Sequence, residues 1–208
     1  RRQHAKGKRP VIDMSTVSKA AHSYLLSAEN ARIVFLDIDG VLHPTLLASQ
    51  QRHTLRQRQE FCQAHNLARL LRETRARVVL CSSWRLYVES RARVEALLQD
   101  LDLPPILDVT PSNALGSRGG EIIDWLVSAT SQQNLSMPQW VVLDDQALPD
   151  LAATGASKHH VRPSPAQGLT EQDVQVAIQQ LMEPCSNKPE FRYHHNRLLR
   201  VFWRLWGL

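Results

Sequence analysis

Residues 33–42 read Ile33-Val34-Phe35-Leu36-Asp37-Ile38-Asp39-Gly40-Val41-Leu42, an apolar run that ends in two aspartates spaced two apart and then a glycine. Such a run of β-forming residues closed by glycine predicts a buried strand. Side chains alternate along an extended backbone, so Asp37 and Asp39 point the same way from the carboxyl end of that strand. Two carboxylates this close are hard to keep ionised without a cation, and Mg²⁺ prefers such oxygen ligands. The pattern therefore predicts phosphoryl transfer, with one carboxylate attacking phosphorus and the other moving protons.

Three later segments also place polar residues where a strand would end or a helix would begin. An apolar run at 78–82 ends in serine, one at 140–145 ends in two aspartates, and 118–126 opens with arginine and two glycines. In this order, with the DxDG of 37–40, they resemble the motifs of the haloacid dehalogenase (HAD) superfamily over residues 32 to about 182. The sequence is similar to the HAD domain of Swiss Army Knife RNA repair proteins in SSWR at 82–85, Thr110-Pro111, RGGEI at 118–122, LDDQ at 143–146 and Gly168-Leu169-Thr170.

Each motif predicts a role. Asp37 is the expected nucleophile, because an ionised carboxylate beside Mg²⁺ can attack a phosphomonoester and form an aspartyl-phosphate. Asp39 is the expected general acid and base, and the resemblance implies that its backbone carbonyl binds Mg²⁺. Ser82 would donate a hydrogen bond to the transferring phosphate, and Arg118 would neutralise the charge that grows on its oxygens. The expected metal site consists of Asp37, Asp39, Asp144 and Asp145, with Asp144 as the direct ligand and Asp145 as the orienting residue.

Several assignments have alternatives. Ser82 ends the apolar run and suits the family pattern, whereas Ser83 could be a second phosphate donor or could cap the next helix. Arg85 is either a structural salt-bridge partner or a ligand of a substrate phosphate. Asp150 is an alternative acidic position in the last motif, although Pro149 beside it indicates a turn. The residues expected to bind substrate are Ser83, Arg85 and Gly40.

Other site classes fit the sequence less well. The twelfth position of a calcium loop counted from Asp37 is Ala48 where that loop needs glutamate. The chain has neither a GxxxxGK[ST] phosphate loop nor a GxGxxG dinucleotide motif. His159-His160 and His194-His195 are adjacent pairs, which is not the spacing of zinc ligands, and we expect them at the surface.

The net charge of the 208-residue chain is +5, and its basic residues concentrate in three places. Residues 1–10 and 184–208 are basic ends. The third place is 52–77, which holds Arg52, Arg56, Arg58, Arg69, Arg72, Arg75 and Arg77. Such a cluster is either a solvated face or a surface that attracts nucleic acid through counterion release. The amphipathic tail after residue 190 could pack on the domain, or contact a partner, a membrane surface or nucleic acid.

Strands that alternate with helices predict an α/β fold with a parallel sheet, and the resemblance implies a HAD-like, Rossmann-type sheet flanked by helices with a minimal cap domain or none. The intervals between motifs leave no room for a large cap. Expected strands are 32–38, 78–82, 140–144 and a weaker one near 158–162, and expected helices are 15–29, 59–74, 88–99, 119–129 and 170–182. We expect a basic extension at 1–30, a catalytic domain at 31–183 and a basic amphipathic tail at 184–208.

The sequence thus predicts a Mg²⁺-dependent phosphomonoester hydrolase. Nucleic-acid ends or nucleotides are the leading substrate class. The alternatives are a phosphatase of small metabolites or phosphoproteins, and a catalytically idle HAD-like binding module. Three cysteines without metal-type spacing and the lack of a ~20-residue apolar run indicate free thiols, a cytoplasmic location and no transmembrane segment.

Overall fold

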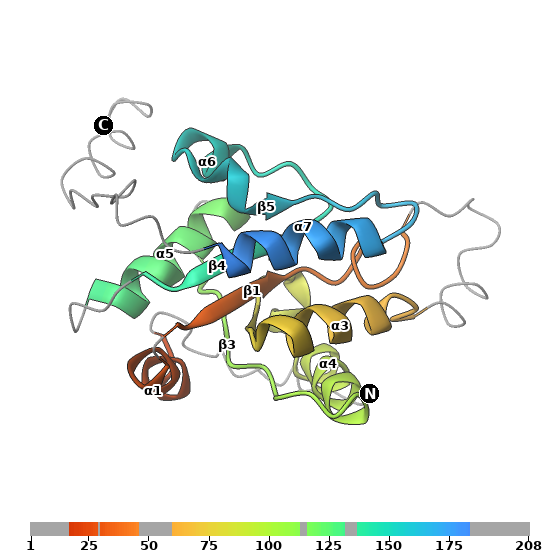
Figure 1. The fold of residues 1–208 in the computed structure, drawn as a ribbon, viewed down its shortest axis with the longest axis horizontal. Coiled ribbons are helices and arrows are strands. Elements are labelled where there is room, and N and C mark those ends of the chain that lie inside the picture. The colour runs from red at the N-terminus through yellow and green to blue at the C-terminus, as the bar shows by residue number, and fades with distance from the viewer. Residues whose placement is uncertain (1–16, 29, 46–59, 113–115, 132–136, 184–208) are drawn as a thin grey trace, which may run out of the picture.

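The computed structural model describes residues 17–28, 30–45, 60–112, 116–131 and 137–183. Its centre is a parallel sheet with the strand order β3-β2-β1-β4-β5, as Figure 1 shows. The strands are β1 (Arg32–Leu36), β2 (Arg77–Leu80), β3 (Asp108–Val109), β4 (Gln139–Leu143) and β5 (His160–Val161). In the register, Leu36 lies beside Leu80 on one side and Leu143 on the other, so the three central strands end level with one another.

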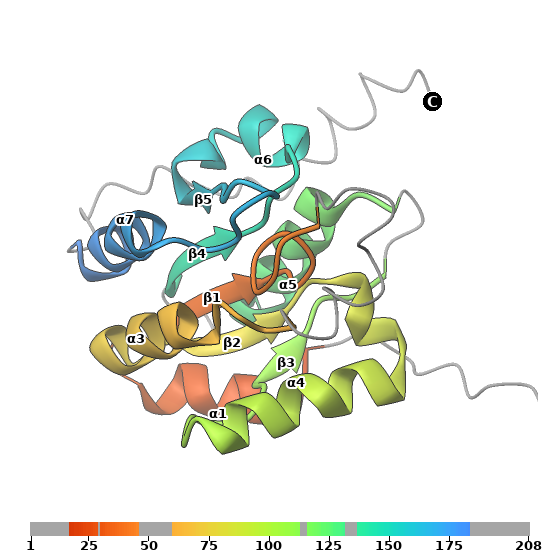
Figure 2. The same ribbon diagram turned by 90° about the vertical axis from the view of Figure 1, so that its right-hand side faces the viewer.

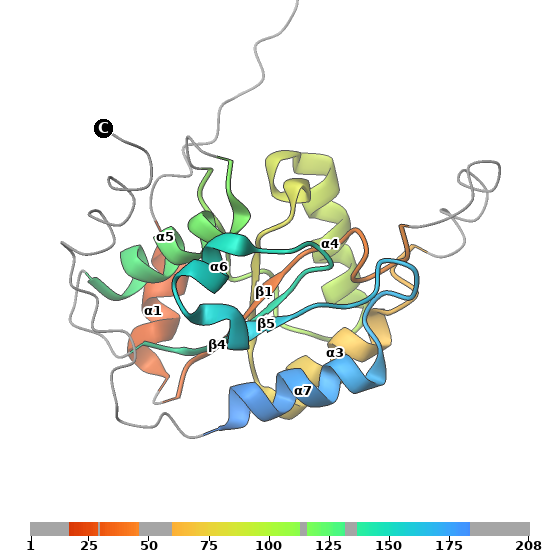
Figure 3. The same cartoon turned by 90° about the horizontal axis from the view of Figure 1, so that it is seen from above.

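Helices cover both faces of this sheet. The α-helices are α1 (Lys19–Ser27), α3 (Ala64–Thr74), α4 (Val88–Asp100), α5 (Arg118–Ser131), α6 (Pro149–Ala153) and α7 (Glu171–Met182), and the short 3₁₀ helices are η1 (Ser83–Leu86) and η2 (Ala156–His159). Alternate residues of each strand face opposite layers: Val34 and Leu36 pack with α3, α4 and α7, whereas Ile33 and Phe35 pack with α1, α5 and α6. Figure 3 shows α3 and α7 together on one side of the sheet.

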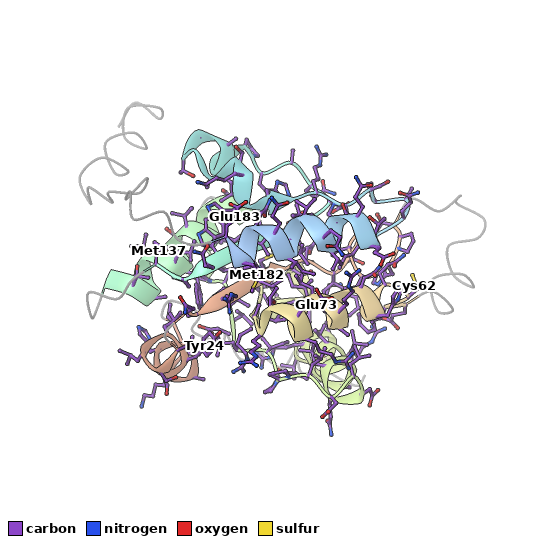
Figure 4. The ribbon with its side chains drawn as sticks, viewed as in Figure 1. Tyr24, Cys62, Glu73, Met137, Met182 and Glu183 are labelled. Carbon is purple, nitrogen blue, oxygen red and sulfur yellow. The ribbon has the colours of Figure 1, made fainter. Side chains whose placement is uncertain are left out.

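All five strands run in one direction, so their carboxyl ends form a single edge. Figure 2 looks onto that edge, with β5 at the top and β3 at the bottom. In Figure 4, Cys62, which precedes α3, lies at this end of the molecule, whereas Met182 and Glu183, which end α7, lie toward the other. From β1 the chain continues to β2 on one side of it, and β4 lies on the other side of β1. This reversal of strand order beside β1 is a topological switch point, where sheets of this kind bind ligands.

The α/β fold class and the absence of a large cap agree with the expectation, within the residues that the structure describes. The expected strand at 158–162 is shorter, and β3 was not expected. Pro149 does not mark a turn, because it occupies the first turn of α6, where its missing N–H costs no hydrogen bond. The expected N-terminal extension contributes α1, whose Ala21 and Leu25 are buried in the same core as Ile33.

Among the described helices, none is long and apolar enough to cross a membrane. Residues 184–208, and with them the expected amphipathic tail and His194-His195, lie outside the described part of the chain. Residues 1–16 also lie outside the described part of the chain.

Candidate active site

Three carboxylates converge at the carboxyl edge of the sheet. Asp37 follows β1, and Asp144 and Asp145 follow β4, the strand beside it. The backbone N–H of Asp37 donates to the carbonyl of Leu143 at 2.9 Å, which extends the strand ladder to the site. All three residues are buried, and one carboxylate oxygen of each lies within 4.8 Å of the others.

Arg118 brings positive charge to these carboxylates from the first residue of α5. Its Nη1 lies 2.9 Å from Oδ2 of Asp37 and 2.6 Å from Oδ2 of Asp144. The start of α5 is fixed from behind, since the Ser117 hydroxyl accepts from the backbone N–H of Gly120 and donates to Asp150. Asp150 therefore supports the helix that carries Arg118, and within the described residues it is not part of the acidic cluster.

The electrostatics of the site follow from its burial. Desolvation raises the pKa of Asp37 to about 6, although Arg118 and a hydrogen bond from the Ser82 side chain lower it and Asp144 raises it further. Burial alone would lower the pKa of Arg118, but the charges of Asp37 and Asp144 outweigh it and raise that pKa. The guanidinium thus stays charged between two carboxylates.

The side chain of Asp39 is held apart from this cluster. Its Oδ1 lies 3.0 Å from Nε2 of His43, and its Oδ2 accepts a hydrogen bond of 2.8 Å from the indole N–H of Trp84. His43 comes from the turn after β1, and Trp84 belongs to η1 after β2. Asp39 stays about a third exposed, with 34% of its side-chain surface accessible.

A pocket opens over these groups. Its lining consists of Asp37, Asp39, Thr45, Ser83, Arg118, Asp145 and Gln146. Ser83, one of the residues expected to bind substrate, lines this pocket. Ser82 is 1% exposed and lies below, where its hydroxyl bonds the Asp37 carboxylate and accepts from the backbone N–H of Trp84. The two serines therefore occupy different positions, Ser82 against the expected nucleophile and Ser83 on the pocket wall.

Asp144 and Asp145, which are adjacent in the sequence, differ in their contacts. Asp144 is fully buried, and its oxygens are taken by Arg118 and by the backbone N–H of Gln146 at 2.8 Å. Asp145 lines the pocket and accepts at 3.0 Å from the Gln146 side chain. These contacts favour Asp145, rather than Asp144, as the carboxylate that a metal ion in the pocket would reach first.

Gly40 is required by this arrangement for a steric reason. Its φ is +80°, and a Cβ there would lie 2.4 Å from the carboxyl carbon of Asp145. Gly40 is not among the residues that line the pocket. The structure therefore favours a role in admitting Asp145, in place of the substrate contact expected from the sequence.

The contacts of Arg85 favour its role as a structural salt-bridge partner over binding of a substrate phosphate. It is buried, its Nη2 lies 2.6 Å from Oε2 of Glu121, and its other nitrogens donate to backbone carbonyls that include those of Cys81 and Thr110. It does not line the pocket. A guanidinium committed in this way braces the loop after β2, so the expected contact with a substrate phosphate is not what the structure favours.

A comparison with known protein families found a match that agrees with this fold and site. Residues 33–174, more than half of the chain, match the family model described as the HAD domain in Swiss Army Knife RNA repair proteins. The chain belongs to this HAD family. Comparisons with curated proteins and with solved structures gave no match. The matched range contains every site residue discussed above and all of the central sheet except Arg32, the first residue of β1.

The arginine cluster of this HAD domain is largely committed to protein contacts where it is described. Arg69 pairs with Glu73 and Glu171, and Arg72 donates to the carbonyl of Leu101. Arg77 opens β2 and thus lies at the edge of the sheet away from the pocket. Arg75 is exposed, and Arg52, Arg56 and Arg58 lie outside the described residues.

The expectation for the first histidine pair is wrong in detail. His159 and His160 are half-buried, and His159 stacks on Trp140 with ring centroids 4.1 Å apart. His160 Nε2 lies 2.9 Å from the Asp144 carbonyl. No sequence signal marks these contacts, because they depend on how η2 and β5 pack beside β4.

Four residues around the pocket were not predicted from the sequence. Thr45 and Gln146 line the pocket, and His43 and Trp84 contact Asp39. Trp84 and Gln146 belong to the quoted motifs SSWR and LDDQ, so their place beside the assigned residues was an available signal. His43 follows Asp39 by four residues, but only the doubling back of the loop brings the two together.

Proposed function

We propose that this HAD domain is a Mg²⁺-dependent phosphomonoester hydrolase that works through an aspartyl-phosphate on Asp37. The observation that carries the proposal is the convergence of Asp37, Arg118 and Asp145 on one pocket, with Asp39 on its wall. This set contains a nucleophile, a positive group for the phosphate and a second carboxyl group that can move a proton.

The site fits a hard divalent cation. Asp37, Asp144 and Asp145 bring three carboxylates into one buried cluster, and Arg118 is the cation that contacts two of them. Three ionised carboxylates leave an excess of buried negative charge, which a bound cation would offset. Oxygen ligands of this kind suit Mg²⁺. The metal would neutralise charge on the phosphate oxygens and favour the ionised form of Asp37.

The chain's own residues supply the remaining steps. An oxygen of Asp37 attacks phosphorus, and the bond from phosphorus to the leaving oxygen breaks as Asp39 gives that oxygen a proton. Asp39 then takes a proton from water, whose oxygen attacks the same phosphorus, and the bond to Asp37 breaks to release inorganic phosphate. Arg118 stabilises the charge on the non-bridging oxygens in both steps, while Ser82 orients Asp37 and Ser83 offers a hydroxyl from the pocket wall.

We propose nucleic-acid ends or nucleotides as the substrate class. The family description, an RNA repair domain, supports this, and so does a site that no further domain covers in the described part of the chain. A phosphatase of small metabolites or phosphoproteins is the alternative. An idle binding module is disfavoured, because Asp37, Asp39 and Arg118 are all present at one pocket.

A substrate screen tests the proposal. Purified protein would be assayed for phosphate release from 3′- and 5′-phosphorylated RNA and DNA, nucleotides, sugar phosphates, phosphopeptides and aryl phosphates, with Mg²⁺ and with EDTA. We expect Mg²⁺-dependent release that Asp37→Asn lowers by more than tenfold, since a lost nucleophile removes several kcal/mol of barrier stabilisation. Release in EDTA would refute the Mg²⁺ dependence, and a fully active Asp37→Asn protein with an unchanged unfolding curve would refute the covalent mechanism.

A further inference from the structure

The carboxylate of Asp39 is held by two donors from different segments of the chain. His43 Nε2 lies 3.0 Å from one oxygen, and Trp84 Nε1 donates at 2.8 Å to the other. The His43 side chain is only 4% exposed. Its Nδ1 is buried and has no hydrogen-bond partner among the described residues, so the ring engages its surroundings through Nε2.

The two donors are themselves fixed. The turn after β1 is closed by a hydrogen bond of 2.9 Å from the Gly40 N–H to the His43 carbonyl. The rings of His43 and Trp84 pack with that of Phe61, at centroid distances of 5.7–6.1 Å. The guanidinium of Arg93 covers the Trp84 ring at 5.0 Å. The two donors to Asp39 therefore belong to one packed aromatic cluster, none of whose residues lines the pocket.

We propose that His43 and Trp84 are positioning residues for Asp39, which together fix its carboxyl group against the leaving oxygen of the substrate. The inference rests on the proposed phosphatase function and assigns two residues to it. Asp39 lines the pocket, and neither His43 nor Trp84 does, so they act through Asp39 without touching substrate.

The geometry explains why two donors are needed. A single hydrogen bond leaves a carboxyl group able to rotate about its χ2 torsion, whereas one bond to each oxygen fixes its plane. Each carboxylate oxygen has two lone pairs, so a bond from behind is compatible with a proton exchanged on the pocket side. Proton transfer requires the acid within hydrogen-bond reach of the leaving oxygen. With no cap in the described part of the chain to press Asp39 into place, this cluster does so within the domain.

The test is the dependence of kcat/KM on the leaving group, because loss of proton donation slows a poor leaving group more than a good one. The substrates are p-nitrophenyl phosphate, whose phenolate leaves readily, and phenyl phosphate, whose phenolate needs a proton. Trp84→Phe keeps an aromatic ring and removes the N–H. We expect it to lose about tenfold more kcat/KM on phenyl phosphate than on p-nitrophenyl phosphate, which is part of the range that general acids contribute.

His43 allows a rescue experiment. His43→Leu removes the donor and should show the same selective loss, whereas His43→Gln keeps an N–H at a similar reach and should recover most of it. Asp39→Asn gives the full extent of the effect. The matched control is Trp125→Phe, because the Trp125 indole also donates to an aspartate, Asp108, at 2.9 Å, but in the core away from the pocket. It should lower stability and leave the ratio of the two substrates unchanged.

Each outcome decides the proposal. Equal losses on both substrates in folded Trp84→Phe protein would make the contact structural and overturn the inference, while Mg²⁺-dependent activity of the wild type would leave the proposed function standing. An unchanged kcat/KM on both substrates would overturn it as well. A wild type without phosphatase activity would remove the proposed function itself, and the inference with it.

Discussion

The Nη2 atom of Arg85 lies 2.6 Å from Oε2 of Glu121, and both side chains are at most 7% exposed. This buried ion pair joins the loop after β2, which carries Ser82, to the helix α5, which carries Arg118. Arg85 also donates to the Ser82 carbonyl at 3.1 Å. The segments that carry Ser82 and Arg118 are thus tied to each other by this buried ion pair.

Removal of this pair should destabilise the protein markedly. Arg85→Met takes the Arg85 guanidinium away from the buried Glu121 carboxylate, and breaking a buried ion pair typically costs about 3–5 kcal/mol of unfolding free energy. Urea unfolding of the two proteins gives the value. The double variant Arg85→Met with Glu121→Gln should regain part of the loss, because no uncompensated charge stays buried. Arg69, which is half-buried and pairs with Glu73 and Glu171, is the control, and Arg69→Met should lower stability much less, because both partner carboxylates stay accessible to water.

The raised pKa of Asp37 predicts a dependence of stability on pH in the absence of metal. In the folded protein this pKa is about 6, against an ordinary value of 3.8. Between these values the folded state keeps a proton that the unfolded chain has lost, so the contribution of Asp37 to stability falls as pH rises from about 4 to 6. Above pH 6 Asp37 is ionised in both the folded and the unfolded state, so its unfavourable contribution to stability is complete and no longer changes with pH.

Asp37→Asn removes the titrating group and should therefore be more stable than the wild type at pH 8. The difference should be on the order of 2 kcal/mol and should shrink toward pH 4. Urea unfolding in EDTA across this range measures it. A difference that grows toward acidic pH would show that Asp37 is stabilised, and not penalised, as an ion. Added Mg²⁺ should narrow the gap at pH 8 by stabilising the wild type more.

The contacts of the two adjacent aspartates predict different defects on substitution. Asp145 lines the pocket, so Asp145→Asn should raise the Mg²⁺ concentration needed for half-maximal activity. Asp144 contacts Arg118, so Asp144→Asn should chiefly lower kcat at saturating Mg²⁺. Mg²⁺ titrations of both variants compare the two effects. The reverse order would return Asp144 to the direct coordination that the sequence pattern suggested.

The central sheet could be predicted because its signals are local. Apolar runs next to the aspartates marked β1 and β4, and the run before Ser82 marked β2. The short β3, Asp108–Val109, has no such signal, since it becomes a strand only through pairing with β2. Pro149 misled the interpretation because proline suits a first helical turn as well as a loop.

The site residues could be predicted where a single sequence motif implies a single role. Asp37 and Arg118 meet in the structure as their motifs suggested. Arg85 stayed open between two roles, because its partner Glu121 is 36 residues away and no spacing rule joins them. His43 was missed for a similar reason. Its contact with Asp39 depends on a turn that brings the backbone of both residues side by side.

The choice between a polymer and a small substrate predicts a difference in salt dependence. If Arg52, Arg56 and Arg58 guide a polyanion, kcat/KM on a phosphorylated oligonucleotide should fall steeply as salt rises, because phosphate contacts release counterions. The kcat/KM on a small aryl phosphate should change much less, since its contacts lie within the pocket and are less screened. Assays between low and physiological ionic strength give both slopes.

Charge reversal sharpens this comparison. Substitution of Arg52, Arg56 and Arg58 by glutamate should reduce kcat/KM on the oligonucleotide selectively and flatten its salt slope, because the pocket is left intact. Arg72→Glu with Arg75→Glu is the matched control from the same arginine-rich segment, since both residues are exposed at the end of α3, near the start of β2 and away from the pocket. That variant should keep the wild-type slope. Equal slopes for the two substrates in the wild type would favour the small-molecule or phosphoprotein alternative, because long-range attraction of a polyanion would then contribute nothing to kcat/KM.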